Sequence, residues 1–281
     1  MRRPIPKKLF KRFDTKRARI ENFSLKNLIL FVFLLSLITS CSNSSGGGSS
    51  KSLPGGATAT FDAENANGDR SIPSTGCSIS TWVNTSNSSL NGNLDCSLGG
   101  GFAGNGIFTS PYRFEFNGTS TVVTTNINPQ PNTMSSTTWM AWVYPTSTTL
   151  QHVLSIDNHS GAFNRALVIQ NSNWSAFTGT STTFESHSVD LNQWQHVAVV
   201  YTPSGITVYK NGTAASFGSA PTINNTAQTF TIGRSAAGGW DYFQGAIAWV
   251  AVYPRELGKN EIQSACRALA NRFDAIVCDS N

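Results

Sequence analysis

Short apolar segments recur along most of this chain, separated by polar clusters rich in Asn, Ser, Gly and Pro. Short runs of β-branched and aromatic residues that are bounded by turn residues are typical of β-strands. The pattern predicts ten strands, over residues 112–116, 121–125, 138–144, 153–157, 166–170, 182–185, 194–201, 206–210, 229–232 and 245–253. So many short strands at close spacing predict an all-β sandwich or jelly roll.

The stretch 194–212 has the most distinct hairpin pattern in the chain. Residues 194–201 are aromatic and β-branched, residues 203–205 (PSG) interrupt them, and residues 206–210 alternate apolar with polar. Residues 211–212 (NG) then supply a second turn, because Asn and Gly adopt positive φ at little steric cost. We therefore expect two adjacent antiparallel strands here.

Two segments near the C-terminus complete the predicted fold. Residues 246–253 (AIAWVAVY) are almost wholly apolar, which is typical of a central strand covered on both faces. Further on, Asn260 is placed to cap a short helix with one apolar face, made by Ile262, Ala265, Cys266, Leu269 and Phe273. The predicted fold is a two-sheet antiparallel jelly-roll sandwich with a short C-terminal helix.

The first 40 residues read as a targeting segment rather than as part of the fold. Basic residues precede the largely apolar run 28–38, which is shorter than the roughly 20 residues that span a bilayer. The run ends in residues 37–41 (LITSC), which resemble a bacterial lipobox and imply cleavage before Cys41 and a lipid on its sulfur. An ordinary secretory signal followed by a chance cysteine is the alternative.

A Gly/Ser-rich linker follows Cys41 and has no apolar side chains to bury over most of its length. Such a composition is typical of a flexible tether. The predicted organisation is therefore a lipoprotein signal peptide (1–40), a lipidated Cys with its linker (41–57), and one domain (58–281).

Charge is distributed unevenly between the leader and the rest of the chain. The formal net charge is +5, but residues 1–40 hold ten of the 20 Lys and Arg and two of the 15 Asp and Glu. The leader thus carries a net +8 and the remainder a net −3. Since the domain lacks a basic surplus, nucleic-acid binding is not expected.

Four cysteines follow Cys41, and an even number in an exported chain indicates disulfides. Three pairings are open, of which proximity favours Cys77 with Cys96 and Cys266 with Cys278. A zinc site is the alternative, although neither a CxxC motif nor a close His pair is present.

Four groups of residues follow one another in a characteristic order. They are residues 116–118 (FNG) with 122–123, residues 138–146 (TWMAWVYPT), residues 194–198 (WQHVA) with 208–212 (VYKNG), and residues 231–233, 243–248, 253–257 and 261–262. Together they resemble the laminin-G-like, concanavalin A-like jelly-roll domains, including those of bacterial lipoproteins. The resemblance covers residues 112–265 and implies this fold for the chain.

The resemblance also implies a calcium site that this sequence lacks in part. The family often has acidic residues after the FNG-like turn and near the last strand, where this chain has Thr119, Ser120, Thr121 and Ala248. Calcium prefers several oxygen ligands that include carboxylates. We therefore expect no metal or cofactor, with calcium as the alternative.

Catalytic patterns are weak in this sequence. Some relatives are glycoside hydrolases, but here the only close acidic pair is Asp62 with Glu64, and it lies in the lead-in to the domain. His196 lies in a predicted strand and reads as structural. No catalytic residue is predicted, and the protein is not expected to be an enzyme.

Aromatic residues in predicted loops are the candidates for ligand binding, because the C–H-rich face of a sugar packs on a flat ring. These candidates are Trp174, Trp240 and Tyr242, with Asp241 as the polar residue between the last two, whereas Trp139, Trp142, Trp194 and Trp249 lie in predicted strands and read as core. We expect a lipid-anchored protein of the bacterial envelope that binds a glycan or an extracellular protein without catalysis. A structural envelope protein and a carbohydrate-active enzyme are the alternatives. Ser42, rather than Asp, follows Cys41, which favours the outer membrane or cell surface.

Overall fold

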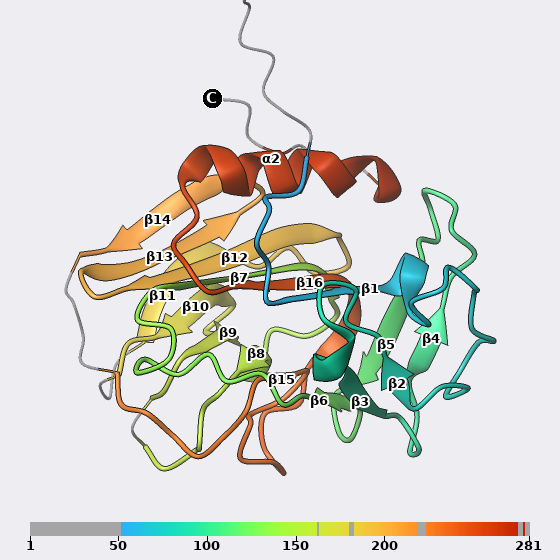
Figure 1. Ribbon diagram of the computed structural model, residues 1–281, viewed down its shortest axis with the longest axis horizontal. Coiled ribbons are helices and arrows are strands. Elements are labelled where there is room, and N and C mark those ends of the chain that lie inside the picture. Colours follow the sequence, from blue (N-terminus) through green and yellow to red (C-terminus); the bar gives the residue numbers. More distant parts are fainter. Residues whose placement is uncertain (1–51, 162, 180–182, 219–222, 275–277, 279–281) are drawn as a thin grey trace, which may run out of the picture. The chain divides into compact units, whose positions relative to one another are not determined.

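The computed structural model describes residues 52–161, 163–179, 183–218, 223–274 and 278 (Figure 1). The predicted signal peptide, Cys41 and the linker up to residue 51 lie outside the described residues. Within the described part of the chain, helices are too short or too polar to cross a membrane.

Two antiparallel β-sheets stack to form the domain (Figure 1). The first sheet has the strand order β14-β13-β12-β7-β16-β5-β4, and β1 also pairs with β16. Its strands are β1 (Ala59–Asp62), β4 (Gly101–Ala103), β5 (Arg113–Asn117), β7 (Thr137–Pro145), β12 (Gln195–Thr202), β13 (Gly205–Lys210), β14 (Thr213–Phe217) and β16 (Gln244–Tyr253).

The second sheet has the strand order β11-β10-β9-β8-β15-β6-β3-β2. Its strands are β2 (Thr81–Trp82), β3 (Gly92–Asp95), β6 (Val122–Thr124), β8 (Gln151–Ser155), β9 (Ala166–Gln170), β10 (Asn173–Phe177), β11 (Thr183–Ser188) and β15 (Thr231–Ile232). Three short 3₁₀ turns lie at Ala63–Asn65, Ser88–Leu90 and Ala270–Arg272, and helix α2 spans Lys259–Leu269. This arrangement confirms the predicted jelly-roll sandwich with a C-terminal helix.

All ten predicted strands are present, and six further strands are not predicted by the sequence pattern. These six are β1, β2, β3, β4, β10 and β14. They are short or rich in Gly, Ser, Asn and Ala, so their own composition carries little strand signal. They form because each pairs with at least one neighbouring strand of its sheet, as β14 does with β13.

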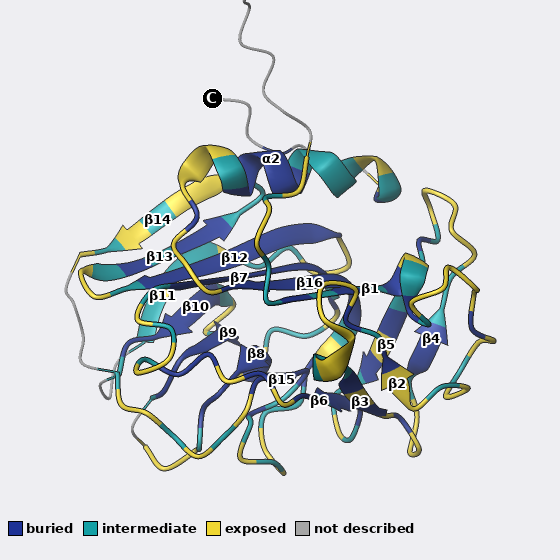
Figure 2. Cartoon of the chain, viewed as in Figure 1, coloured by how far each residue is buried: buried dark blue, intermediate teal, exposed yellow. Residues whose placement is uncertain are grey.

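Strand β16 lies in the middle of the first sheet and is covered on both faces, as its apolar run predicts. On its inner face Val250 and Val252 join the core between the sheets. On its outer face Trp249 and Ala251 pack beneath helix α2 with Cys266. Figure 2 shows β7, β12 and β16 as buried almost throughout, whereas the edge strand β14 is exposed.

Helix α2 begins differently from the prediction. Its N-cap is Gly258, whose backbone N–H donates to Glu261 Oε2 at 3.1 Å. Asn260 therefore lies within the first turn and is not the cap, because the capping contacts come from the backbone of Gly258 and the side chain of Glu261. The apolar face of the helix, which includes Ile262 and Cys266, packs on the first sheet as expected.

Both predicted disulfides are present. Cys77 pairs with Cys96, and Cys266 pairs with Cys278, with Cα–Cα distances of 5.5 and 5.9 Å. The second bridge ties the C-terminal segment to helix α2.

The last six residues assigned to the linker, 52–57, pack on the domain instead of forming a free tether. Ser264 Oγ on α2 donates to the Ser52 carbonyl at 2.7 Å, and Tyr253 Oη donates to the Pro54 carbonyl at 2.9 Å. Figure 1 shows this segment, in blue, running from α2 to β1. The sequence places the boundary later because four of these six residues are Ser, Gly or Ala and one is Pro, a composition typical of a linker.

A domain that starts at Ser52 is expected to be more stable than one that starts at Thr58. The shorter form loses the bonds from Ser264 and Tyr253, so its free energy of unfolding should fall by about 2 kcal/mol. Urea unfolding of the two forms measures the difference. Equal midpoints and slopes would contradict this role for residues 52–57.

Candidate functional site

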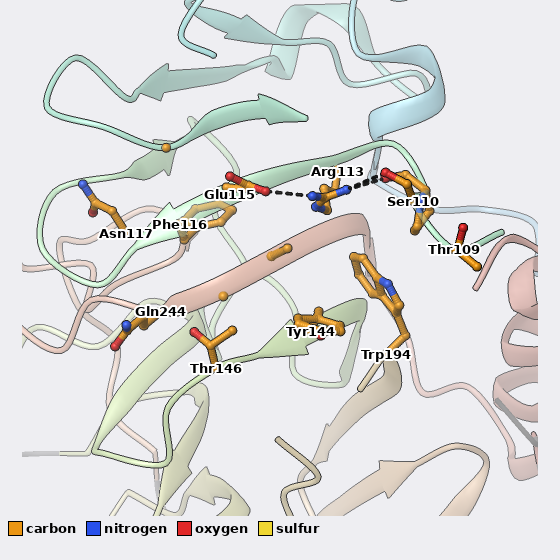
Figure 3. Close-up of a pocket in the computed structure, with 14 residues that line it drawn as sticks. Thr109, Ser110, Arg113, Glu115, Phe116, Asn117, Tyr144, Thr146, Trp194 and Gln244 are labelled. Atoms are coloured by element: carbon orange, nitrogen blue, oxygen red, sulfur yellow. Dashed lines mark hydrogen bonds and ion pairs between the residues drawn. The ribbon is translucent and has the colours of Figure 1, made fainter. Parts of the chain in front are cut away.

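A groove of about 460 Å³ crosses the outer face of the first sheet (Figure 3). It lies over β5, β16 and the end of β7, where β16 pairs with both neighbours. Ala246 on β16 is opposite Glu115 on β5 and opposite Tyr144 on β7, so the three residues form one row across the sheet. Because neighbouring strands are about 4.8 Å apart, the small Ala246 side chain leaves a trough between Glu115 and Tyr144.

One wall of the groove is polar and charged. Arg113 Nη2 lies 2.8 Å from Glu115 Oε1, and Arg113 Nη1 donates to the Pro111 carbonyl at 3.2 Å. The Glu115 side chain is 50% exposed, so this ion pair adds little to stability. Its Oε2 atom takes part in no hydrogen bond or ion pair with the described residues, which leaves it available as an acceptor.

The opposite wall is aromatic. The ring of Tyr144 lies 5.5 Å from the ring of Trp194, and Trp194 packs in turn on Phe273 at 4.7 Å. Trp194 is buried, as predicted, although it lies one residue before β12 and not within the strand, and its side chain also lines the groove. Figure 3 shows the two rings on the other side of β16 from Arg113 and Glu115.

The turn at the end of β5 is held by Asn117. Its Oδ1 atom accepts hydrogen bonds from the backbone N–H groups of Thr119, Ser120 and Thr121 at 2.9–3.1 Å. An oxygen that already accepts three N–H groups is a poor cation ligand. Among the described residues, no group of three or more acidic, His or Cys side chains is arranged to hold a metal ion.

Trp174 is not a ligand-binding residue, and its prediction as one is wrong. It lies on β10, is fully buried in the core between the sheets, and donates its ring N–H to Gln195 Oε1 at 2.9 Å. The polar residues around it resemble a loop in sequence. They form a strand because β10 pairs with both β9 and β11.

The other three predicted ligand-binding residues lie in the connection between β15 and β16. Trp240 is 55% exposed, and its ring stacks on that of His159 at 4.6 Å with 7° between the planes. Tyr242 lies beneath the guanidinium of Arg234 at 5.9 Å. Asp241 lines a second cavity, and none of the three lines the groove on the first sheet.

His196, which the sequence predicts to be structural, lies in β12. Its ring is fully buried beside the rings of Trp142 and Trp249, at 5.4 and 6.4 Å. Burial lowers its pKa to about 3. The imidazole is thus neutral and part of the core beneath α2.

The groove residues are not predicted from the sequence, although one signal for them is present. In β5 (RFEFN), Arg113, Glu115 and Asn117 alternate with two buried Phe residues. This alternation places the polar residues on one outer face. It does not reveal that Ala246 and Tyr144, which are far away in sequence, lie beside them.

The comparisons with known proteins agree with this architecture. Residues 116–263, more than half of the chain, match the Laminin_G_3 model, described as the concanavalin A-like lectin/glucanases superfamily. The chain therefore belongs to the concanavalin A-like lectin/glucanase superfamily. No protein with a curated description matches the sequence.

Solved structures with the same fold include enzymes and binding domains. A Trypanosoma rangeli sialidase mutant with trans-sialidase activity is similar at 18% identity and a TM-score of 0.56, over 81% of this chain and 35% of that chain. The binding domain of botulinum neurotoxin DC, in complex with rat synaptotagmin II, is similar at 15% identity and a TM-score of 0.52, over 78% and 52%. A structure of botulinum neurotoxin type C, whose cell entry depends on two ganglioside molecules, has 15% identity and a TM-score of 0.50, over 76% and 51%.

This chain thus spans about a third of the sialidase and about half of the neurotoxin chains. At these identities the likeness concerns the fold alone. The activities of those proteins do not pass to this chain by similarity.

Proposed function

We propose that the domain is a non-catalytic glycan-binding module whose ligand lies in the groove over β5, β16 and β7. The observation that carries this proposal is the row Glu115–Ala246–Tyr144, which combines a hydrogen-bonding wall, a small floor and an aromatic wall. A sugar ring presents hydroxyl groups at its edge and C–H groups on its face, so it complements both walls. Sites of this kind combine apolar surface with a few placed polar groups.

The charges in the groove favour binding over catalysis. Most glycoside hydrolases act through two carboxyl groups on opposite sides of the scissile bond. Glu115 is the only carboxylate that lines the groove among the described residues, and it is paired with Arg113. The groove therefore lacks a second acid or base for that reaction.

Family membership and two of the fold relatives support a glycan or a protein as the ligand. The superfamily is described as lectins and glucanases, and one fold relative enters cells through gangliosides while another binds synaptotagmin. A glycan is the partner that the polar and aromatic walls suit best. A protein partner would be the outcome if no glycan binds.

We further propose that Cys41 carries a lipid that holds the domain on the bacterial envelope, at the outer membrane or cell surface. The support is the lipobox-like segment 37–41, together with the Gly/Ser composition of the residues that follow. Metabolic labelling with a fatty-acid analogue tests it, with Cys41→Ala as the variant that should lose the label.

A glycan array probed with the domain from Ser52 tests the binding proposal. We expect Ala246→Leu to fill the trough and weaken binding by at least tenfold, which corresponds to about 1.4 kcal/mol. Tyr144→Ala should also weaken binding, because it removes the exposed part of the aromatic wall. The matched control is Ala214→Leu on the exposed edge strand β14, outside the groove.

The control variant should bind as the unmodified domain does. Because Ala246 is buried and a larger side chain there lowers stability, binding is compared at a temperature at which circular dichroism shows every variant folded. If Ala246→Leu binds a glycan as tightly as Ala214→Leu does, the groove is not the site. If the array shows no ligand for the unmodified domain, the structural role becomes the better account.

A further inference from the structure

A second cavity, separate from the groove, lies where β8 and the end of β10 meet the connection between β15 and β16. Its volume is about 360 Å³. One side is apolar and includes Leu150, Phe163 and Phe177. The rings of Phe163 and Phe177 pack edge to face, with 5.0 Å between their centroids. The other side is formed by His152, Asp157 and Asp241.

The charges around this cavity are not balanced. Two carboxylates line it, and neither Lys nor Arg is among the described residues that do. Asp157 accepts hydrogen bonds from the backbone N–H groups of Asn164 and His159, both at 3.0 Å. The Asp241 carboxylate has no hydrogen-bond donor among the described residues, and its only close polar neighbours are His152 and His159, at 3.4 and 3.8 Å.

His152 supplies a buried donor at the same end of the cavity. It is fully buried, and Ser155 Oγ lies 3.1 Å from its Nδ1 while accepting the backbone N–H of Asp157 at 2.9 Å. The Ser155 hydroxyl can donate its proton to Nδ1, and in that tautomer the ring proton of His152 is on Nε2. His152 Nε2 faces Asp241 but is not aligned for a hydrogen bond, so it has no partner in the described structure.

The backbone around the cavity is also held in an unusual conformation. His159, Phe163 and Asp241 have φ values of 51°, 47° and 52°, in the left-handed region that non-glycine residues rarely adopt. Such conformations persist where the surrounding structure enforces them, and they are often found at functional sites. Here they turn the Asp241 carboxylate and the Phe163 ring toward the same space.

We propose that this cavity binds a small amino alcohol, with a protonated amine and a hydroxyl group on neighbouring carbons of an apolar body. The ammonium group would donate to the Asp241 carboxylate and offset the unbalanced negative charge. The hydroxyl oxygen would accept the Nε2–H group of His152, and the carbon skeleton would contact Phe163 and Phe177. An organic cation suits the site better than a metal ion, because the acidic and His side chains do not converge in a ligating geometry.

The carboxyl pKa values also suit a cationic ligand. Burial raises the pKa of both Asp157 and Asp241, because desolvation disfavours the charged form. A bound ammonium would favour the charged form again.

Three matched probes test the proposal by calorimetry at pH 7.5 on the domain from Ser52. They are trans-2-aminocyclohexanol, cyclohexylamine, which lacks the hydroxyl, and cyclohexanol, which lacks the charge. We expect the amino alcohol to bind at least tenfold more tightly than cyclohexanol, and cyclohexylamine to lie between them. Equal binding of the amino alcohol and cyclohexanol, or no binding of any probe, would overturn the proposal.

Two variants locate the site. Asp241→Asn keeps the shape of the side chain, and asparagine also adopts the left-handed backbone conformation. The variant should nevertheless bind the amino alcohol at least tenfold more weakly. Asp190→Asn is the matched control, since Asp190 pairs with Lys210 and does not line this cavity. Equal losses in both variants, or none in Asp241→Asn, would contradict the site, while glycan binding in the groove should be unchanged in either.

Discussion

Between pH 7 and pH 5 the free energy of unfolding is expected to fall by about 4 kcal/mol, because two histidines must stay neutral in the fold. Burial lowers the pKa of His152 and of His196 to about 3 in each case. In the unfolded chain both titrate near 6.5. Each therefore takes up a proton on unfolding below pH 6.5. For every unit by which the pH then falls, the free energy of unfolding decreases by about 1.4 kcal/mol per histidine.

The sign follows from which state binds more protons. The unfolded chain is the more protonated state between pH 6.5 and 3, so this stability is fully present above pH 6.5 and is lost as the pH falls toward 3. The raised carboxyl pKa values of Asp157 and Asp241 act in the opposite direction, because there the folded state binds the extra proton. Urea unfolding at pH 7, 6 and 5 measures the net change.

His196→Leu separates the two contributions. Both ring nitrogens of His196 are buried without a hydrogen-bond partner, so an apolar side chain of similar size removes an unfavourable burial. We expect the variant to be at least as stable as the unmodified protein at pH 7. The loss between pH 7 and pH 5 should shrink to about 2 kcal/mol. An unchanged loss would mean that His196 is not the group responsible.

Arg165→Met should lower the free energy of unfolding by about 3 kcal/mol at pH 7. Arg165 is buried and pairs with no carboxylate among the described residues. Its guanidinium instead donates to the carbonyls of Pro129, Met134 and Ser135 at 2.7–3.0 Å. Methionine keeps the apolar stem but leaves three carbonyls without that donor, at about 1 kcal/mol or more each.

The matched control is Arg255→Met, which removes an exposed ion pair with Glu261. Exposed pairs contribute about 0–1 kcal/mol, so this variant should stay close to the unmodified protein. Urea unfolding measures both. A similar small loss in the two variants would contradict the role of Arg165 as the residue that holds the connection between β6 and β7.

The candidate site was less predictable than the fold, and its residues explain why. Trp240 and Asp241 were singled out correctly as loop residues, and Asp241 lines a cavity with His152. Trp174 was assigned to a loop because its neighbours are polar, but strand pairing buries it. Whether the Trp174 ring is exposed depends on its neighbouring strands β9 and β11, which the local sequence pattern does not identify.

Three features were determined by the sequence alone. The alternation and the turn residues specified the central strands, since the side-chain period of a strand is two. The apolar run of β16 specified a strand covered on both faces. The short separations within two cysteine pairs favoured the pairing that is present.

The tertiary structure alone decided where ligands can bind. The groove exists because β16 places Ala246 between Glu115 and Tyr144, residues that are about 30 to 130 positions apart in the chain. The cavity exists because three separate segments bring His152, Phe163 and Asp241 together. The local sequence pattern predicts on which face of a strand a side chain lies. Strand order and loop packing determine which other side chains lie beside it, and a binding site needs several side chains together.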